Sequence, residues 1–459
     1  MARIATHQPE RMHWNVVVCG GGMSGVCAAT AAARLGAKTL LVERDASLGG
    51  TMANNLVGPM MTFHSPTQQV VGGLAQEVVD RLIALGGAVG HILDTSDYCP
   101  TITPFEAEAL KLVSQRMVRE AGGRILYNTF ISGVTKEGNT ITGIQITNKG
   151  GVANLRADVV IDCTGDADVA ALAGAPTVMG RAEDGLVQPL TLMFKLTHVD
   201  NAALRAYSAE HLPEVMLDDR QIKNYLNQAL NKNYGFAEKL ARYGDQGKAI
   251  TERRDILFFN TIYEDEVTVN STRVSQVNPL DPWALSEAED AAREQVFGLY
   301  EFFRNEVPGF AQCRLGAVGF RIGVRESRRI VGEYVLTADD ILNQRRFADA
   351  IARSAYPIDI HAVRAGEAEF DSFGYRGEVY EIPYRCLVPL EVEHLLVAGR
   401  SISTTHEAQA SVRTSPTCMA FGQAAGSAAV LAMQQETPPR TIDTVALRTL
   451  LVSQGALLG

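Results

Sequence analysis

Three glycines near the beginning of the chain have a spacing suited to holding phosphate groups. An apolar run, 16–19, leads directly into Gly20-x-Gly22-x-x-Gly25, and Ser24 lies within this motif. The first glycine permits a tight turn, the second lets the backbone approach a pyrophosphate, and the third lets a helix pack closely on the strand. The beginning of that helix offers free N–H donors and positive potential. We therefore expect these four residues to bind the pyrophosphate of a dinucleotide.

A carboxylate follows at the distance at which ribose is bound. Glu43 comes directly after a second apolar run, 39–42, and lies 18 positions after Gly25. An acid about 20 residues beyond the glycine turn accepts hydrogen bonds from ribose hydroxyls. The doublet Gly49-Gly50 then stands where an FAD domain turns back across the pyrophosphate, and plain NAD domains lack it. The pattern favours FAD, and its expected ligands in this stretch are Glu43, Arg44, Gly50 and Thr51.

Two later motifs complete the expected FAD site. Thr164-Gly165-Asp166 follows the apolar run 159–161, which is typical of a buried strand in a parallel sheet. Gly399-Arg400 follows another apolar run, 395–398, and Arg413 comes shortly afterwards. Each motif is a backbone turn at the end of a predicted strand. We expect contacts with the cofactor from Thr164, Gly165, Asp166, Gly399, Arg400 and Arg413.

Flavin chemistry also needs a group that transfers a proton to or from the substrate. Asp359 and His361 lie two positions apart in an extended-looking segment after Pro357. A period of two places both side chains on one face, and a carboxylate beside an imidazole can orient it as a base. His361 is therefore the expected proton-transfer residue. A structural role for this histidine is the alternative, and the sequence alone does not separate the two.

An arginine-rich stretch supplies candidates for binding negative charge. Guanidinium groups bind a substrate carboxylate or stabilise a reduced flavin, or they pair with neighbouring acids such as Glu326 and Glu333. We expect Arg328 and Tyr334 to be catalytic-pocket residues. The other arginines of the stretch are Arg321, Arg325 and Arg329, and further polar residues expected near the flavin in supporting roles are His64, Asn270, Arg273 and His406.

The elements that must position these residues alternate between strands and helices. Residues 14–43 have the pattern of strand, glycine turn, helix and strand, and the helix is rich in alanine, which permits close packing on a sheet. Apolar residues at helical spacing predict helices over 105–121 and 286–305. Two strand patterns around Gly138-Asn139 predict a hairpin. A long helix of small residues is expected to begin near Pro416.

The predicted fold class is α/β: a Rossmann-like FAD-binding domain built from both chain ends, with an inserted α+β substrate domain. The FAD-binding domain takes residues 1–180 and 381–459, and the substrate domain takes residues 181–380. Within the insert, 200–250 has a helical pattern broken at Pro213, whereas 255–275 and 316–337 have strand patterns. A chain of 459 residues is long enough for two or three domains.

Composition and charge exclude several classes of protein. The net charge of −10 argues against nucleic acid as a main partner. The 7 cysteines form no CxxC pair, so no iron–sulfur or other metal site is expected, and their apolar neighbours are typical of buried, reduced thiols. No apolar stretch is long enough to span a bilayer, and residues 1–14 show no secretory signal. We expect a cytoplasmic protein with a small-molecule substrate and no membrane partner.

Several motifs recur together in one group of flavoproteins. They are Leu48-Gly49-Gly50-Thr51, Thr164-Gly165-Asp166-Ala167-Asp168, Gly323-Val324-Arg325-Glu326-Ser327-Arg328-Arg329-Ile330, Gly332-Glu333-Tyr334-Val335-Leu336-Thr337, Tyr356-Pro357-Ile358-Asp359-Ile360-His361, Ile382-Pro383-Tyr384-Arg385 and Ala398-Gly399-Arg400. In these motifs the chain resembles the FAD-dependent oxidoreductase family, which has a glutathione-reductase-type FAD fold and is related to the flavoproteins of fumarate reductase and heterodisulfide reductase. The resemblance covers nearly the whole chain. It implies non-covalent FAD and an inserted substrate domain, it is compatible with a homo-oligomer, and it implies no particular substrate.

The activity expected from these features is that of a dehydrogenase or oxidase, which transfers a hydride between a small polar metabolite and N5 of the flavin. An NAD(P)H-dependent flavin monooxygenase is one alternative, and a fumarate-reductase-like reductase that runs the transfer in reverse is another. The chain has no second GxGxxG motif, which weighs against a reductase with two dinucleotide sites. A flavin-binding structural or tRNA-modifying scaffold subunit is a third hypothesis. The net negative charge of the chain argues against it, because RNA binding needs a basic surface.

Overall fold

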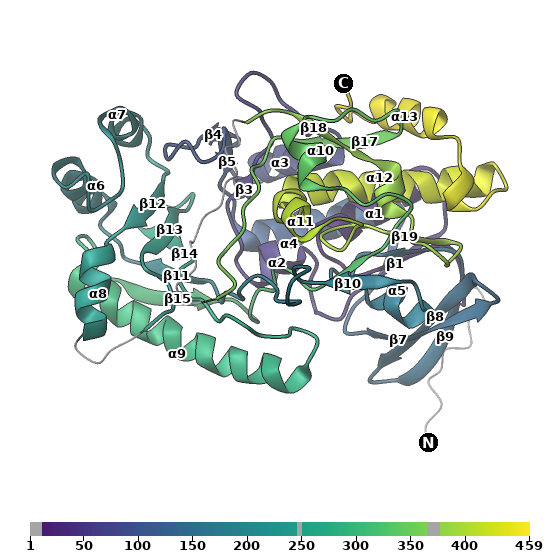
Figure 1. Cartoon of the computed structure of the whole chain (residues 1–459), viewed down its shortest axis with the longest axis horizontal. Helices are drawn as coiled ribbons and strands as arrows, with labels where there is room; N and C mark the ends of the chain where they lie inside the picture. Colours follow the sequence, from purple (N-terminus) through teal and green to yellow (C-terminus); the bar gives the residue numbers. More distant parts are fainter. Residues whose placement is uncertain (1–11, 246–249, 365–376) are drawn as a thin grey trace.

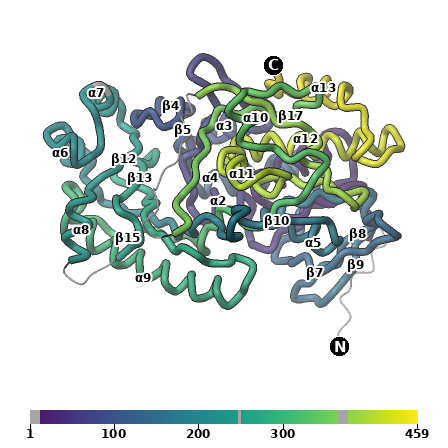
Figure 2. The backbone as a smooth tube through the Cα atoms, viewed as in Figure 1, coloured from purple at the N-terminus to yellow at the C-terminus, as the bar shows by residue number. Residues whose placement is uncertain are grey.

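The structure is a computed structural model that describes residues 12–245, 250–364 and 377–459. Figure 1 shows a larger part, which contains the beginning and the end of the chain, beside a smaller part formed by its middle. The tube in Figure 2 follows the chain from the larger part into the smaller one and back again. The prediction that residues 1–14 show no secretory signal falls mostly on residues 1–11, which lie outside the described residues. The predicted α/β class is confirmed.

A seven-stranded sheet forms the centre of the larger part. Its parallel strands lie in the order β6, β2, β1, β9, β19, so a strand from the last quarter of the chain pairs with β9. Val18 of β1 pairs with Leu41 of β2 and with Ile161 of β9, and Leu396 of β19 also pairs with Ile161. The strands are β6 (Arg124–Leu126), β2 (Thr39–Val42), β1 (His13–Cys19), β9 (Gly151–Asp162) and β19 (Leu395–Val397).

The parallel arrangement brings the predicted cofactor motifs to one edge of this sheet. Gly20 follows β1, Glu43 follows β2, Thr164 follows β9 and Gly399 follows β19. The carboxyl ends of parallel strands meet at the same edge, where ligands of open α/β sheets bind. The strand order agrees with the prediction that both ends of the chain build this part, because β19 lies in the same sheet as β1 and β2.

The first half of β9 belongs to an antiparallel extension of the sheet. It pairs with β8 (Thr140–Asn148), which pairs in turn with β7 (Phe130–Glu137), and the turn between β7 and β8 is the predicted one at Gly138-Asn139. Helix α5 (Asp168–Ala173) packs against β7. Figure 1 shows these strands extending to the lower right of the molecule.

Two helices rich in small residues pack against each other beside the sheet. α1 (Met23–Arg34) has every residue buried except Arg34, and α12 (Ser415–Gln434) begins where the sequence predicts. A Cβ at Gly422 would come within 2.0 Å of the Ser24 carbonyl oxygen, and one at Gly426 within 2.2 Å of the Ala28 carbonyl oxygen. Only glycine permits this approach of the two backbones, which fixes the beginning of α1 beneath the cofactor motifs.

A five-stranded antiparallel sheet, covered by the long helix α9 (Pro282–Glu306), forms the smaller part. α9 begins four residues earlier than predicted because the Asp281 carboxylate accepts hydrogen bonds from the N–H groups of Trp283 and Ala284. The helical pattern over 200–250 is interrupted by a strand, β12, which the sequence did not indicate. The elements are β11 (Phe194–Thr197), α6 (Asn201–Glu210), α7 (Asp219–Asn227), β12 (Lys232–Gly235), α8 (Ala237–Asp245), β13 (Ile256–Asn260), β14 (Glu266–Val269) and β15 (Arg314–Val318).

The remaining elements lie in and around the larger part. The predicted domain divisions after residues 180 and 380 stay predictions, but Leu336, Ile341 and Tyr380 pack in the same core cluster as Val16 and Val26. The elements are α2 (Gly50–Asn54), β3 (Met60–Met61), α3 (Leu74–Ala84), β4 (Ile92–Leu93), β5 (Thr101–Thr103), α4 (Ala107–Glu120), β10 (Thr177–Met179), β16 (Arg328–Ile330), α10 (Ala338–Leu342), β17 (Ala350–Ser354), β18 (Tyr380–Pro383), α11 (His406–Val412) and α13 (Thr444–Ser453).

The described residues contain neither a helix suited to span a membrane nor a cluster of side chains suited to hold a metal ion. No helix there has both the length and the apolar character needed to cross a membrane. Within residues 12–245, 250–364 and 377–459, no group of three or more histidine, cysteine, aspartate or glutamate side chains is placed to hold a metal ion. The seven cysteines are all buried and form no disulfide.

Candidate active site

A cavity of about 460 Å³ lies between the two parts and is lined by residues of both. This volume is within the range of ligand sites. The cofactor motifs supply part of the lining, and Asp359, His361 and Arg413 belong to the same lining. Of the residues predicted to bind cofactor or substrate, the cavity lining contains Gly20, Gly22, Ser24, Glu43, Arg44, Gly50, Thr51, Thr164, Gly165, Asp166, His361, Gly399, Arg400 and Arg413.

The glycines of the first motif differ in what surrounds them. Gly20 has φ +104°, and a Cβ there would come within 2.4 Å of the Cys163 carbonyl oxygen. A Cβ at Gly25 would come within 1.9 Å of the Gly20 carbonyl oxygen, so Gly25 serves packing and does not line the cavity. A Cβ at Gly22 would meet no atom within 4 Å. Gly22 precedes α1 and makes no side-chain cap, which leaves a cradle of N–H donors open to the cavity.

Glu43 is buried at the cavity wall and is held by backbone donors. Its Oε1 accepts a hydrogen bond from the Asp45 N–H at 2.7 Å, and its Oε2 accepts one from the Gly21 N–H. Burial raises the pKa of this carboxyl, although the two N–H donors act to lower it. Each carboxylate oxygen has a second lone pair. The Glu43 carboxylate is thus oriented by the glycine turn and can still accept hydrogen bonds from sugar hydroxyls.

Asp166 is bound to Arg400 at the ends of β9 and β19. Its Oδ1 accepts hydrogen bonds from Arg400 Nη2 and from the Ser327 hydroxyl, both at 2.6 Å. Burial alone would raise the pKa of Asp166, but the Arg400 charge and the Ser327 hydrogen bond hold it below its ordinary value. Arg400 Nε has no hydrogen-bond partner in the described part of the chain. This pair joins the segments that follow β9 and β19, and both residues line the cavity.

The cavity lining also contains a buried Asp359–His361 pair. His361 Nε2 lies 3.5 Å from Asp359 Oδ2, which also accepts hydrogen bonds from the Tyr356 hydroxyl at 3.1 Å and from Arg413 Nη2 at 3.3 Å. Burial opposes ionisation of Asp359, yet His361 and Arg413 lower its pKa to about 2. Burial, together with Arg325 and Arg413, holds the pKa of His361 well below its usual value despite Asp359. The carboxylate is charged and the imidazole is neutral at pH 7.

Of the arginine-rich stretch, two members face the cavity and two do not. Arg325 lines the cavity, and its Nη1 donates to the Pro189 carbonyl at 2.6 Å and to the Thr191 hydroxyl at 2.5 Å. Arg321 also lines the cavity and forms an ion pair with Asp45. Arg329 is buried in an ion pair with Glu326.

The structure does not place the predicted catalytic residues Arg328 and Tyr334 in the cavity lining. Arg328 donates to the Asp166 carbonyl at 2.8 Å and to the Asp168 carboxylate at 2.5 Å. The Tyr334 hydroxyl donates to Asp340, 3.0 Å away, and accepts a hydrogen bond from Arg345. Their partners give both side chains structural roles, and the geometry offers no support for a catalytic one.

The supporting polar residues are likewise divided. Asn270 lines the cavity and approaches Arg325 Nη2 at 3.5 Å, whereas His406 is buried with Nδ1 2.9 Å from Glu326. His64 lies outside the lining, with its ring 4.9 Å from that of His91. Arg273 is buried beside α9, where its backbone N–H donates to the Gln295 side chain at 2.8 Å.

Two residues of the site were not singled out by their sequence. Tyr356, which binds Asp359, belongs to a motif that carries the family resemblance, so a signal for it was present. Gln188 had no such signal. Its Oε1 accepts hydrogen bonds from the His361 N–H at 3.4 Å and from Arg413 Nη2 at 3.5 Å, which joins segments more than 170 residues apart.

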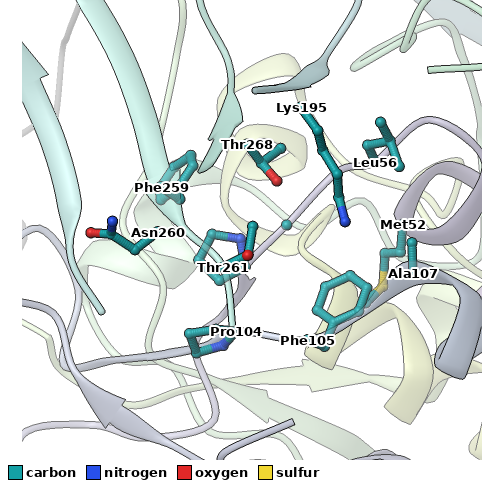
Figure 3. A pocket seen from close by; sticks show the side chains of 12 residues that line it. Met52, Leu56, Pro104, Phe105, Ala107, Lys195, Phe259, Asn260, Thr261 and Thr268 are labelled. Carbon is teal, nitrogen blue, oxygen red and sulfur yellow. The ribbon is translucent and has the colours of Figure 1, made fainter. Parts of the chain in front are cut away.

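A second, smaller cavity adjoins the first but is too small for a substrate. It has a volume of about 20 Å³ and shares Met52 and Phe259 with the larger lining. Figure 3 shows Lys195 and Phe105 among the side chains that line it. Lys195 Nζ is paired with Glu266 at 2.9 Å. A space of this size holds about one water molecule, so the larger cavity is the candidate site.

A family model for FAD dependent oxidoreductases matches residues 15–451, and the chain therefore belongs to that family. It is an oxidoreductase whose cofactor is FAD, as the glycine cradle, Glu43 and the Asp166–Arg400 pair would allow. When bound, FAD supplies a redox-active ring that accepts or donates a hydride. The N–H groups at the beginning of α1 would donate hydrogen bonds to its pyrophosphate, and the Glu43 carboxylate would accept hydrogen bonds from its ribose.

The tRNA modification enzymes MnmG of several bacteria are similar to part of the chain. The tRNA uridine 5-carboxymethylaminomethyl modification enzyme MnmG of Rhodopirellula baltica is 36% identical over 93 residues, which are 20% of this chain and 12% of the relative. The MnmG of Exiguobacterium sibiricum is 30% identical over 166 residues, which are 33% of this chain and 24% of the relative. The matches thus span less than a quarter of the length of these relatives.

Similarity to solved structures extends over nearly the whole chain at low identity. A geranylgeranyl bacteriochlorophyll reductase-like protein from Thermoplasma acidophilum matches with 13% identity and a TM-score of 0.44, covering 97% of this chain and 84% of that one. The p-nitrophenol 4-monooxygenase PnpA from Pseudomonas putida matches with 13% identity and a TM-score of 0.45, covering 97% and 87%.

Proposed function

We propose that this protein is a dehydrogenase or oxidase that moves a hydride between a small polar metabolite and N5 of FAD, with His361 transferring the proton. One observation carries the proposal: the cavity whose wall contains the glycine cradle also contains the Asp359–His361 pair. A substrate in this cavity can therefore contact both the cofactor ring and an acid–base group. Residues of both structural parts form the walls.

The environment of His361 suits it to accept a proton. Burial keeps the imidazole neutral, because its pKa lies well below the usual value. Asp359 Oδ2, 3.5 Å from Nε2, favours a proton on that nitrogen, so the basic lone pair of the neutral ring is on Nδ1, which is itself a buried atom. Once the ring takes up a second proton, the charged carboxylate stabilises the imidazolium. Arg413 and Tyr356 hold this carboxylate in place.

Anaerobic mixing with candidate substrates tests the assignment. Hydroxy acids, sugars and amino compounds are screened for loss of the flavin absorbance, and the active one is mixed with wild type, His361→Gln and, as a control, His211→Gln, which changes an exposed histidine. General base catalysis contributes about 10²- to 10⁴-fold, so we expect flavin reduction to slow by at least about 100-fold in His361→Gln only. Reduction of His361→Gln at the wild-type rate would refute the role of His361. Rapid bleaching by NADPH alone would contradict the dehydrogenase or oxidase.

A further inference from the structure

Positive charge is in excess around His361. Arg325 and Arg413 both line the cavity and act on His361, and Asp359 is the carboxylate that acts on the charge of Arg325. Arg253 and Arg273 add like charge, although Arg253 is paired with Asp255 at 2.7 Å. His361 is neutral. Two guanidinium groups therefore share one carboxylate at the cavity wall, and the balance is positive.

The other carboxylates of the lining are engaged elsewhere. Each accepts a hydrogen bond or forms an ion pair with a group other than Arg325 and Arg413. Glu43 accepts from Gly21 and Asp45, Asp45 pairs with Arg321, Asp166 with Arg400, Asp168 with Arg328, and Glu289 accepts from the Ile322 N–H. They do not offset the charge beside His361.

The two arginines retain donors that the protein does not use fully. The acceptors of Arg325 are neutral: the Pro189 carbonyl, the Thr191 hydroxyl and, at 3.5 Å, the Asn270 amide oxygen. Arg413 makes bonds of 3.3 Å or more to Asp359 and Gln188, and its buried Nε has no partner in the part of the chain that the structure describes. Each guanidinium has five N–H donors. A buried charge that is not balanced is costly unless a ligand completes it.

We propose that Arg325 and Arg413 bind a carboxylate of the substrate, so that the class of substrate is small carboxylic acids. The inference rests on the proposed function and narrows it, since uncharged alcohols and sugars would leave the positive charge unmatched. A carboxylate matches the fork of a guanidinium with two parallel hydrogen bonds. It would lie beside His361, which places the carbon atoms next to the carboxylate within reach of the base.

Binding to the oxidised, FAD-loaded protein tests this without turnover. Glycolate, lactate and malonate are titrated against the flavin absorbance in parallel with glycolamide, lactamide and malonamide, which have nearly the same shape and no charge. The proteins are wild type, Arg325→Gln, Arg325→Lys and the control Arg314→Gln, which removes an exposed guanidinium from β15. Bound FAD and the thermal midpoint are measured for each. If Arg325→Gln does not fold, Arg413→Gln replaces it.

We expect at least one acid to bind 10-fold or more tightly than its amide, because hydrogen bonds to charged groups contribute more than neutral ones. The preference should fall at least about 10-fold in Arg325→Gln, fall less in Arg325→Lys and persist in Arg314→Gln. Equal binding of acids and amides across the panel would overturn the proposal. If Arg325→Gln binds the acids as tightly as wild type does, the proposal is also overturned, even if the reduction potential of the flavin changes.

The outcome separates this inference from the function it refines. If a neutral compound reduces the flavin with dependence on His361, and acids do not bind, the carboxylate site is wrong and the oxidoreductase assignment stands. If acids bind through Arg325 but His361→Gln leaves every reduction rate unchanged, the site stands and the proton-transfer role fails.

Discussion

Replacing Gly22 by alanine is expected to weaken FAD binding while leaving the apoprotein folded, whereas the same change at Gly25 should destabilise the fold. The two residues lie three positions apart in one motif, but their surroundings differ. A Cβ at Gly22 meets no atom within 4 Å, and its φ of −64° suits alanine. A Cβ at Gly25 would lie 1.9 Å from the Gly20 carbonyl oxygen. A Cβ atom essentially never comes closer than 3.0 Å to another heavy atom outside its own chain neighbours.

The magnitudes follow from these distances. Alanine at Gly22 changes the stability of the apoprotein by less than about 1 kcal/mol, which is the size of a cap or glycine effect. Its methyl group occupies the place where backbone and pyrophosphate meet. Displacing one charge-assisted hydrogen bond costs about 1.5–3 kcal/mol, which is a loss of about 10- to 100-fold in FAD affinity. Alanine at Gly25 forces the turn and α1 apart and costs at least about 2 kcal/mol in folding free energy.

Two measurements on each variant separate these effects. Denaturant unfolding of the apoprotein gives the stability, and quenching of FAD fluorescence on titration with apoprotein gives the affinity. Gly36→Ala is the control for a change of glycine to alanine outside the cavity, since a Cβ at Gly36 also meets no atom within 4 Å, although its φ of +89° adds local strain. Wild-type FAD affinity in Gly22→Ala, or an apoprotein of Gly25→Ala as stable as wild type, would refute the reasoning.

Two further predictions concern charge. Burial and the nearby His64 lower the pKa of His91 to about 4 from the ordinary 6.5. Between these pH values the unfolded chain binds more protons than the folded one, so the stability of the protein falls as the pH is lowered. Denaturant unfolding at pH 7, 5.5 and 4.5 should show a smaller fall in stability for His91→Asn than for wild type, and an equal fall would contradict the prediction. Arg400→Ala removes the charged partner that lies 2.6 Å from the Asp166 carboxylate and should lower the free energy of unfolding by about 1–3 kcal/mol. Asp166→Asn should restore part of this loss in the double variant. If the costs of the two single changes simply add in a double-mutant cycle, the two residues are not coupled.

Much of the cofactor site could be predicted because its requirements are local. A glycine with positive φ, a run of apolar residues and a carboxylate at a set distance are properties of a few consecutive residues. Gly20, Glu43, Thr164 and Gly399 accordingly follow strands that the sequence indicates, and all of them line one cavity. The hairpin of β7 and β8 was found for the same reason, since its turn residues and alternation are adjacent in the chain.

The roles of the arginines were decided by the tertiary structure. Arg325 and Arg328 are three positions apart in an equally charged stretch, yet Arg325 faces the cavity and Arg328 binds Asp168, 160 positions earlier. The sequence left strand and helix arrangements open for this stretch, but most of it is irregular, with only a short strand at its end. The periodicity of a sequence indicates on which face of a helix or strand a residue lies. It does not indicate which distant residue that side chain contacts.

The sequence by itself determined the glycine turn, the parallel strands around it and the FAD cofactor, because these depend on steric and hydrogen-bonding needs within short segments. Only the tertiary structure decided that Gln188 meets His361 and that Arg325, not Arg328, lies beside the Asp359–His361 pair. These contacts depend on how the middle of the chain packs against the segments from its two ends. Contacts between segments more than 100 positions apart, such as those of Gln188 with His361 and of Arg325 with Pro189, select them, and no local pattern encodes that selection.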